Sequence, residues 1–224
     1  MTTDDLLLPS ELQHRLERLL QAGSRRVLGL TGPPGCGKST LAERLRWALG
    51  EQAQVVPMDG FHLAHAELIR LGLEQRKGAP ETFDSAGYVA LLRRLRTQGL
   101  TEVVYAPDFR REIEEPVAGS IAVQPRTQLL ITEGNYLLLE DGHWADVSAL
   151  LDEVWYLELD APLRLERLHA RHVRHGHGTE EARRWIASND EPNARLIEAS
   201  RQRADAVLRW NEINTTDKLE ATAC

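Results

Sequence analysis

The stretch from Gly32 to Ser39, GPPGCGKS, places the strongest constraint on how this chain can fold. Its spacing of glycine, four residues, glycine, lysine and serine is that of a phosphate-binding loop, but only where a strand precedes it and a helix follows. Residues 27–31, VLGLT, form a short apolar run typical of a buried strand. Leucines at helical spacing then continue to residue 49, and Gly50 can end that helix. The flanks therefore support a strand, loop and helix unit.

The chemistry of this loop indicates a nucleoside triphosphate. Its glycines permit backbone angles that direct several N–H groups into one concavity at the positive end of the helix: Gly32, Gly35 and Gly37. Lys38 would reach the β- and γ-phosphates, and Ser39 offers a hydroxyl to Mg²⁺. Cys36 is expected to be a small filler, although a thiol at a helix N-terminus can have a lowered pKa. We therefore expect ATP and Mg²⁺ as cofactors.

Further apolar runs predict the fold class. They lie at 53–58, 129–132, 154–159 and 204–210 and alternate with helical patterns, one of them an N-terminal helix at 10–22 with a capping box at Ser10. Residues 103–105 predict another strand, followed by a proline- and charge-rich connection from 106 to 119. Continuous apolar strands indicate a parallel sheet covered on both faces. We predict a single α/β domain over residues 1–224, with its core at 27–210.

Composition limits the functional classes. The net charge of −7 argues against nucleic acid as the main partner, because phosphate neutralisation needs a basic face. No run of 18 apolar residues suggests a membrane span, and the acidic N-terminus is unlike a secretory signal. With only Cys36 and Cys224, a disulfide scaffold is not expected. These features predict a cytoplasmic protein.

Two acidic residues follow predicted core strands. Asp59 comes after QVVPM, and Glu133 comes after QLLIT. In open α/β sheets, ligands bind beyond the carboxyl ends of the strands. A carboxylate there can hold Mg²⁺ or accept a proton from an attacking hydroxyl, and either residue could do either.

A cluster of arginines predicts a lid. Arg164, Arg167, Arg171 and Arg174 would lie within about 80° of a helix circumference, in a segment that begins near Pro162. We expect a phosphate-facing lid over about 162–178, and a solvated basic face paired with nearby glutamates is the alternative. Four histidines between 169 and 177 overlap it; a polar lid tip is favoured over a metal site, because no cysteine accompanies them.

These stretches together resemble the P-loop kinase family that contains uridine kinase, phosphoribulokinase and bacterial pantothenate kinase. The resemblance is greatest to bacterial members labelled as fructose transport system kinases. The matching segments run in the family's order over about 27–210: GPPGCGKST, PMDGFHL, RKGAPETFD, YAPDFRREIEEP, ITEGNYLLL, RLERLHARHVRHG and NARLIEASRQRADAVL.

The resemblance implies roles for particular residues. It implies a five-stranded parallel sheet with a mobile lid, and ATP-dependent phosphorylation of a hydroxyl. Asp59 becomes the base for that hydroxyl and Glu133 a Mg²⁺-associated carboxylate that also faces the acceptor. The arginines placed at the phosphates are Arg167, Arg171 and Arg174. Thr40 belongs to the nucleotide-binding stretch, and Asn193 is placed near the adenine.

The acceptor pocket is expected from residues 77–84 and 105–111. Its implied members are His62, Lys77, Asp84, Tyr105, Arg110 and Asn135. The chain lacks the YDF run that helps to form the nucleoside pocket of uridine kinases. The acceptor therefore stays open between a sugar such as fructose, a nucleoside and a pantothenate-like alcohol.

Other functional classes were weighed against a kinase. A GTP-dependent switch would need an Asn-Lys-x-Asp string, and a transport ATPase a Leu-Ser-Gly-Gly-Gln-like segment; neither string is present. A non-catalytic, regulatory ATP-binding protein remains the alternative, because sequence does not reveal turnover. The expected partners are ATP and a small-molecule acceptor, with a homodimer left open.

Overall fold

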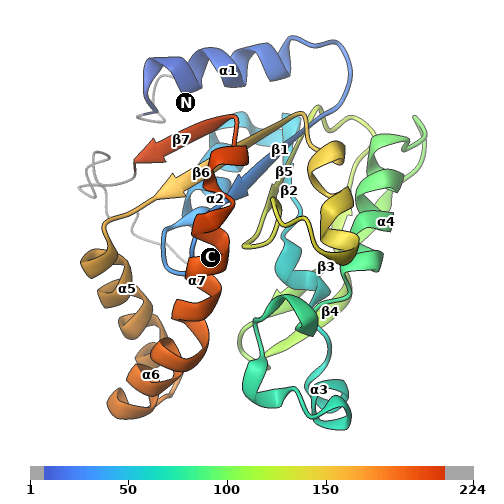
Figure 1. The fold of residues 1–224 in the computed structure, drawn as a ribbon. Helices are drawn as coiled ribbons and strands as arrows, with labels where there is room; N and C mark the ends of the chain where they lie inside the picture. Colours follow the sequence, from blue (N-terminus) through green and yellow to red (C-terminus); the bar gives the residue numbers. More distant parts are fainter. Residues whose placement is uncertain (1–7, 210–224) are drawn as a thin grey trace, which may run out of the picture.

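The computed structural model describes residues 8–209 and is built around a five-stranded parallel sheet (Figure 1). The strand order is β2-β5-β1-β6-β7, and every neighbouring pair is parallel. The strands are β1 (Arg26–Thr31), β2 (Ala53–Val55), β5 (Leu129–Glu133), β6 (Glu153–Glu158) and β7 (Ala206–Arg209). All five fall within or beside the predicted apolar runs, and the predicted end of the last run, residue 210, lies outside the described residues.

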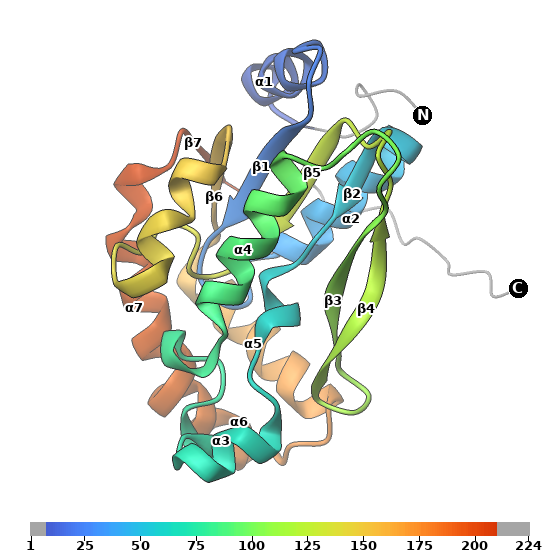
Figure 2. The same ribbon diagram turned by 90° about the vertical axis from the view of Figure 1, so that its right-hand side faces the viewer.

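Helices cover both faces of this sheet, which confirms the predicted α/β class. Helices α1 (Ser10–Leu20) and α2 (Lys38–Leu49) contribute to one apolar cluster, whereas α4 (Ser85–Arg96) and α7 (Glu191–Ala199) contribute to another. Figure 2 shows α4 and α2 on opposite sides of the strands. Every residue of β5 is buried, as expected for a strand enclosed on both faces.

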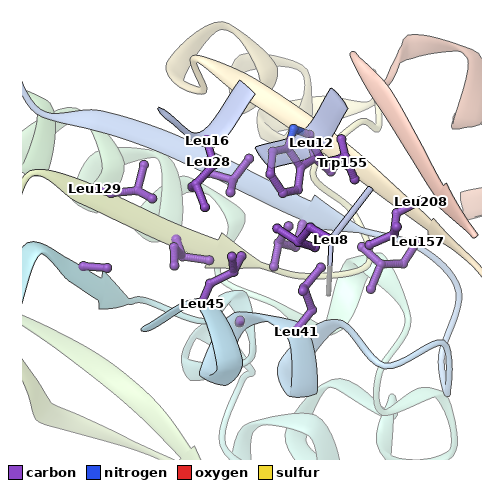
Figure 3. Packing of buried hydrophobic residues seen from close by; sticks show 14 of the residues in the cluster. Leu8, Leu12, Leu16, Leu28, Leu41, Leu45, Leu129, Trp155, Leu157 and Leu208 are labelled. Atoms are coloured by element: carbon purple, nitrogen blue, oxygen red, sulfur yellow. The ribbon is translucent and has the colours of Figure 1, made fainter. Parts of the chain in front are cut away.

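The N-terminal helix belongs to the main core. Leu12 and Leu16 of α1 lie in the same cluster as Leu41 and Leu45 of α2 and Trp155 of β6 (Figure 3). All of these side chains are at most 3% exposed. Because leucines recur every three or four residues, α1 presents one continuous apolar stripe to the sheet.

Several predicted helix ends are confirmed and others are corrected. Gly50 ends α2 with φ of 56°, a left-handed value that glycine adopts without strain, and Asp84 caps α4 by accepting a hydrogen bond from the Gly87 N–H. Helix α1 begins at Ser10 with no side-chain cap, so the predicted capping box is wrong, and it ends at Leu20 rather than at 22. Helix α4 ends at Arg96.

The predicted connection at 106–119 is wrong, because most of it forms a β-hairpin. Strands β3 (Val104–Arg110) and β4 (Glu115–Val123) pair with each other, antiparallel and outside the main sheet. Only Val104, Ala106 and Val123 of these strands are buried. The predicted strand at 103–105 overlaps the start of β3, but the rest of the hairpin is partly or fully exposed and lacks the apolar run that revealed the strands of the main sheet.

The remaining elements lie around the carboxyl ends of the parallel strands. They are α3 (His65–Leu71), α5 (Ala161–Arg174), α6 (Thr179–Trp185) and a π-helical turn at Ile186–Asp190 that leads into α7. Figures 1 and 2 place α3, α5 and α6 at the same lower end of the molecule. The predicted lid at 162–178 corresponds to α5 and the turn that follows it. Within residues 8–209, no helix combines the length and apolarity needed to cross a bilayer.

Truncation of Leu16 tests the contribution of α1 to the core. Leu16 is fully buried, so Leu16→Ala should lower the free energy of unfolding by about 2–5 kcal/mol through lost burial and a cavity. The control is Leu100→Ala, at a side chain that is 92% exposed and should change stability by less than about 0.5 kcal/mol. Urea unfolding measures both, and equal effects would contradict this role for α1.

Candidate active site at the carboxyl ends of the strands

The phosphate-binding loop connects β1 to α2, as predicted. Gly35 and Gly37 have φ of 85° and 98°, which non-glycine residues rarely adopt. A Cβ atom on Gly32 would lie 2.5 Å from the carbonyl oxygen of Leu157. The glycines thus allow both the turn and a close approach to β6, and the loop ends at the N-terminus of α2, where anions bind favourably.

Lys38 is the first residue of α2 and is held against its own loop. Its Nζ donates hydrogen bonds of 2.7 Å to the Gly32 carbonyl and 3.3 Å to the Pro33 carbonyl. Cys36 is fully buried, and burial raises the pKa of its thiol although Lys38 opposes the shift. The thiol is therefore a packing residue, as expected, and the lowered pKa considered for it is not found.

Ser39 and Glu133 join the loop to the central strand. The Ser39 hydroxyl donates a hydrogen bond of 2.8 Å to Glu133 Oε1 at the end of β5. Glu133 is only 7% exposed. Burial raises the pKa of Glu133 and the charge of Asp59 adds to the rise, whereas Lys38 and the Ser39 hydrogen bond oppose it. A buried carboxylate beside a hydroxyl at a phosphate loop is suited to a magnesium ion, whose preferred ligands are oxygen atoms.

Asp59 follows β2 in a short 3₁₀ turn, Met58–Phe61. Two glycines bring this turn close to its neighbours. A Cβ on Gly134 would lie 2.5 Å from the Met58 Cβ, and one on Gly60 would clash with the Pro107 carbonyl of β3. Because Met58 and Gly134 directly adjoin the two acids in sequence, their contact holds Asp59 and Glu133 at one site.

A cavity of about 320 Å³ lies between α2, β2 and the hairpin, and it reaches both acids. Arg111, just beyond β3, lies on its wall with its Nη2 3.6 Å from Asp59 Oδ2. The residues that line the cavity are Ser39, Ala42, Glu43, Arg46, Gln54, Val55, Pro57, Asp59, Asp108, Phe109, Arg111, Ile121 and Glu133. The P-loop hydroxyl, both strand-end acids and two arginines, Arg46 and Arg111, therefore share one cavity.

Aromatic rings form a surface beside Asp59. The His62 ring lies 4.0 Å from the Phe83 ring and 4.8 Å from the Phe109 ring, measured between centroids, and its Nδ1 lies 2.8 Å from the Asp59 carbonyl oxygen. Burial lowers the pKa of His62, so a neutral imidazole is favoured. Lys77 Nζ lies 5.1 Å from the Phe109 centroid, which brings the predicted residues His62 and Lys77 to this surface.

Only part of the predicted arginine stripe faces the site. Burial lowers the pKa of Arg171, and the positive charge of Arg111 lowers it further. Three acids oppose this shift: Asp190, Asp59 and Glu133. Arg171 therefore lies within the electrostatic field of both strand-end acids. Arg164 is 2% exposed and its Nη2 lies 2.5 Å from Glu191 Oε1, so it holds α5 against α7. The alternative of a solvated basic face is therefore wrong for Arg164. Arg167 is partly exposed and Arg174 is exposed.

Other predicted acceptor residues have different surroundings. Asp84 caps α4, and Tyr105 is 60% exposed on β3. Arg110 is exposed, with its Nε 3.8 Å from Asp108 Oδ2. The Asn135 carbonyl accepts a hydrogen bond of 3.2 Å from the Thr31 hydroxyl beside the phosphate loop, and Thr40 is exposed there. None of these residues lines the cavity.

The side-chain amide of Asn193 bonds to the segment at residues 77–84. Its Nδ2 lies 3.5 Å from the Gly78 carbonyl, and the neighbouring Asn189 donates a hydrogen bond of 2.7 Å to the Lys77 carbonyl. These bonds tie α7 and the preceding π turn to the 77–84 segment. The placement of Asn193 near an adenine remains a prediction.

Arg111 was not among the individual residues selected from the sequence, although its segment was. A bulge between Ala106 and Asp108 interrupts the register of the hairpin. Strict alternation along the strand therefore does not indicate which of the adjacent residues Arg110 and Arg111 faces Asp59. To single out Arg111 from the sequence, the hairpin and its bulge would have to be predicted first.

Two of the four histidines between residues 169 and 177 lie beside acidic side chains. His172 Nε2 lies 2.8 Å from Asp190 Oδ2, and His177 Nδ1 lies 3.2 Å from Glu181 Oε1. In residues 8–209, no three histidine, cysteine, aspartate or glutamate side chains gather as a metal site would require. The histidines thus connect α5, α6 and the π turn.

Comparison with known proteins identifies the family. The model of the phosphoribulokinase / uridine kinase family matches residues 27–217, which include the phosphate loop, both strand-end acids and α5. The chain belongs to this family. It is accordingly a P-loop kinase, a phosphotransferase that uses ATP and an alcohol acceptor.

Individual relatives agree with this assignment. The protein named "Putative uridine kinase C227.14" from Schizosaccharomyces pombe is 35% identical over 92% of each chain. A crystal structure described as a "putative fructose transport system kinase" from Silicibacter sp. TM1040 is 41% identical, with a TM-score of 0.80 over 89% of this chain and 97% of the other. The kinase-like protein YFH7 of Saccharomyces cerevisiae, 21% identical, has a TM-score of 0.74 over 92% and 97% of the two chains and shares the fold.

Addition of one methyl group at Gly134 tests whether its contact with Met58 positions the acids. Gly134→Ala should lower the free energy of unfolding by about 1–3 kcal/mol, because the new Cβ overlaps Met58, and should weaken binding of Mg·ATP. Gly99→Ala is the control, since its Cβ would have a neighbour only at 3.9 Å. Urea unfolding and calorimetry measure both effects. Wild-type values in Gly134→Ala would show that the close approach does not position the site.

Proposed function

We propose that this kinase transfers the γ-phosphoryl group of ATP to a hydroxyl of a small metabolite such as a sugar, a nucleoside or a pantothenate-like alcohol, with Asp59 as the general base. One observation carries the proposal: Ser39, Glu133 and Asp59 line the same cavity, directly beside the phosphate loop. Since the reaction consumes ATP, we also place the enzyme in the cytoplasm.

The proposed reaction moves one proton and one phosphoryl group. The acceptor oxygen attacks the γ-phosphorus, the bond from that phosphorus to the β–γ bridging oxygen breaks, and ADP leaves. The acceptor proton passes to the Asp59 carboxylate, which is 31% exposed and therefore accessible. Phosphoryl transfer depends mainly on positioning and charge stabilisation, which a rigid strand end and fixed cations can supply.

Lys38 and Arg171 are proposed to stabilise the transferring charge. Lys38 bonds to two carbonyl oxygens and, at 4.0 Å, to the Cys36 sulfur, all in its own loop, so phosphate oxygens at the loop could replace these partners. Arg171 is partly buried; burial lowers its pKa, and the charges of Asp59 and Glu133 oppose that shift. In a desolvated site, a fixed cation stabilises developing negative charge more strongly than it would in water.

A magnesium ion fits the oxygen ligands at the end of β5. The exposed Ser39 hydroxyl and the buried Glu133 carboxylate lie 2.8 Å apart, and they are the residues that would hold it. When bound, Mg²⁺ neutralises phosphate charge. We assign Glu133 to the metal and Asp59 to the proton, because Glu133 is already bonded to the P-loop serine.

A transfer assay tests the proposed function. The enzyme is incubated with Mg²⁺ and ATP labelled in the γ-phosphate, with sugars, nucleosides, pantothenate and other small alcohols as acceptors. We expect label in an acceptor and stoichiometric ADP. ATP binding without label in any acceptor would favour the regulatory alternative instead.

Replacement of Asp59 tests the assignment of the base. Asp59→Asn retains the size and one acceptor oxygen but cannot take a proton, so kcat should fall at least about a hundredfold while Mg·ATP affinity changes only a fewfold. Glu133→Gln should instead shift the dependence on Mg²⁺ concentration. Steady-state kinetics and calorimetry measure both. A normal rate for Asp59→Asn with the true acceptor would remove Asp59 as the base.

Replacement of lid arginines tests their role in charge stabilisation. Arg171→Ala should lower kcat by about ten- to a thousandfold, since its charge lies within the field of the two acids. Arg174→Ala should lower kcat less than Arg171→Ala does if the structure already shows the closed lid, because Arg174 is exposed in it. Rates at saturating acceptor measure this, and wild-type rates in both variants would make the arginines surface residues only.

A further inference from the structure

Of the two arginines that line the cavity, Arg46 donates a hydrogen bond to a carboxylate, whereas Arg111 has only a longer ion contact. Four carboxylates lie on the cavity wall, and three of them have other partners. Glu43 accepts a hydrogen bond of 2.8 Å from Arg46, Asp108 lies 3.8 Å from Arg110, and Glu133 accepts from Ser39. The fourth carboxylate is Asp59, which faces Arg111.

Arg111 is weakly bound in the present arrangement. Its contact with Asp59 is 3.6 Å, too long for a hydrogen bond, and within the described residues its guanidinium makes no closer polar contact. The side chain is 41% exposed on the cavity wall. In the proposed reaction Asp59 accepts a proton and becomes neutral, so Arg111 then needs another anion.

A second cation lies on the same aromatic ring. Lys77 Nζ is 5.1 Å and Arg111 Cζ is 6.0 Å from the Phe109 centroid. Lys77 donates a hydrogen bond of 2.8 Å to the Glu114 carbonyl, and its ion pair with the Glu114 carboxylate is 3.2 Å long. The Glu114 side chain is 55% exposed, so water screens this pair, and Lys77 remains a second positive charge beside Phe109, which lines the cavity.

The transferring phosphate already has its own cations. Lys38 and Arg171 lie on the side of the phosphate loop and α5. The charge of Arg111 lowers the pKa of Arg171, a repulsion that a nearby anion would offset. A second anion beside Arg111 would therefore complete the charge balance of the site.

We propose that the acceptor itself carries an anionic group, a phosphate or a carboxylate, and that Arg111 binds it, with Lys77 as the neighbouring cation. The inference rests on the proposed function and names its substrate class: small hydroxylated phosphate esters or hydroxy acids. Arg111 lies 3.6 Å from Asp59, so the reacting hydroxyl and the anion must lie close together in the acceptor. The planar guanidinium can bind either anion with two parallel hydrogen bonds.

Calorimetry with matched probes tests the proposal without turnover. The pairs are glycerol with glycerate and fructose with fructose 6-phosphate, each titrated into the full chain with Mg²⁺ and a non-hydrolysable ATP analogue. In at least one pair the anionic member should bind about 10- to 100-fold more tightly, the range of a charge-assisted hydrogen bond. Equal binding within both pairs, or no binding of either anion, overturns the proposal.

Variants of Arg111 assign the effect to one side chain. Arg111→Ala should remove the preference for the anion and leave the affinity for the ATP analogue within about twofold, whereas Arg111→Lys should restore part of it. Arg70→Ala is the control, because Arg70 forms an exposed ion pair with Glu67 on α3. The inference is overturned if Arg111→Ala keeps the preference for the anionic probe. It is also overturned if Arg111→Ala weakens binding of the ATP analogue as much as binding of the anion.

Turnover separates this inference from the proposed function. Anion binding that depends on Arg111 but without phosphoryl transfer supports the acceptor site and overturns the kinase mechanism. Transfer to a neutral acceptor, with the same KM in Arg111→Ala as in wild type, supports the kinase and overturns the anionic acceptor. Transfer to an anionic acceptor whose KM rises about 10- to 100-fold in Arg111→Ala supports both.

Discussion

The strand order β2-β5-β1 is the constraint on which the candidate site depends. Parallel strands place their carboxyl ends at one edge, and β5 lies between the strand that leads to Asp59 and the strand that leads to the phosphate loop. The hydrogen bond of 2.8 Å from Ser39 to Glu133 spans the gap between β5 and the loop. Residues far apart in sequence thus meet because the sheet aligns their strands.

Small residues and buried charges then shape this edge. Gly134 and Gly60 allow Met58 and the hairpin to approach closely, which narrows the space around the two acids. Burial disfavours the charges of Glu133 and Arg171, so the free site contains unfavourable electrostatics. Opposite charges supplied by a metal and by phosphates would relieve them, and such desolvated, charged clefts are typical of catalytic sites.

The sequence was sufficient for the parts of the molecule that have a strong local signal. The phosphate loop is defined by glycine spacing, and the strands by apolar runs such as residues 129–133, all of which are buried. Beyond the short strand predicted at 103–105, the hairpin was missed because its strands are largely exposed and interrupted by a bulge after Ala106. The separation of Arg164 from the other arginines also could not be foreseen, since its partner Glu191 is 27 residues away in sequence.

The distinction between Arg110 and Arg111 illustrates the same limit. Both belong to a segment that the family resemblance marked, and their chemistry is identical. Only tertiary structure decides that Arg111 faces Asp59 while Arg110 faces Asp108. Sequence therefore predicted the kind of chemistry at this edge, and the packing of the hairpin against the 58–61 turn determined which residues reach it.

A crystal structure with Mg²⁺ and a non-hydrolysable ATP analogue tests the central claim most directly. The account predicts phosphates in the loop, with Lys38 Nζ moved from the Gly32 carbonyl to phosphate oxygens and the metal beside Ser39 and Glu133. It also predicts that Asp59 stays free of the metal and faces the γ-phosphate across the cavity. A nucleotide bound elsewhere, with Lys38 still bonded to Gly32, would contradict the account.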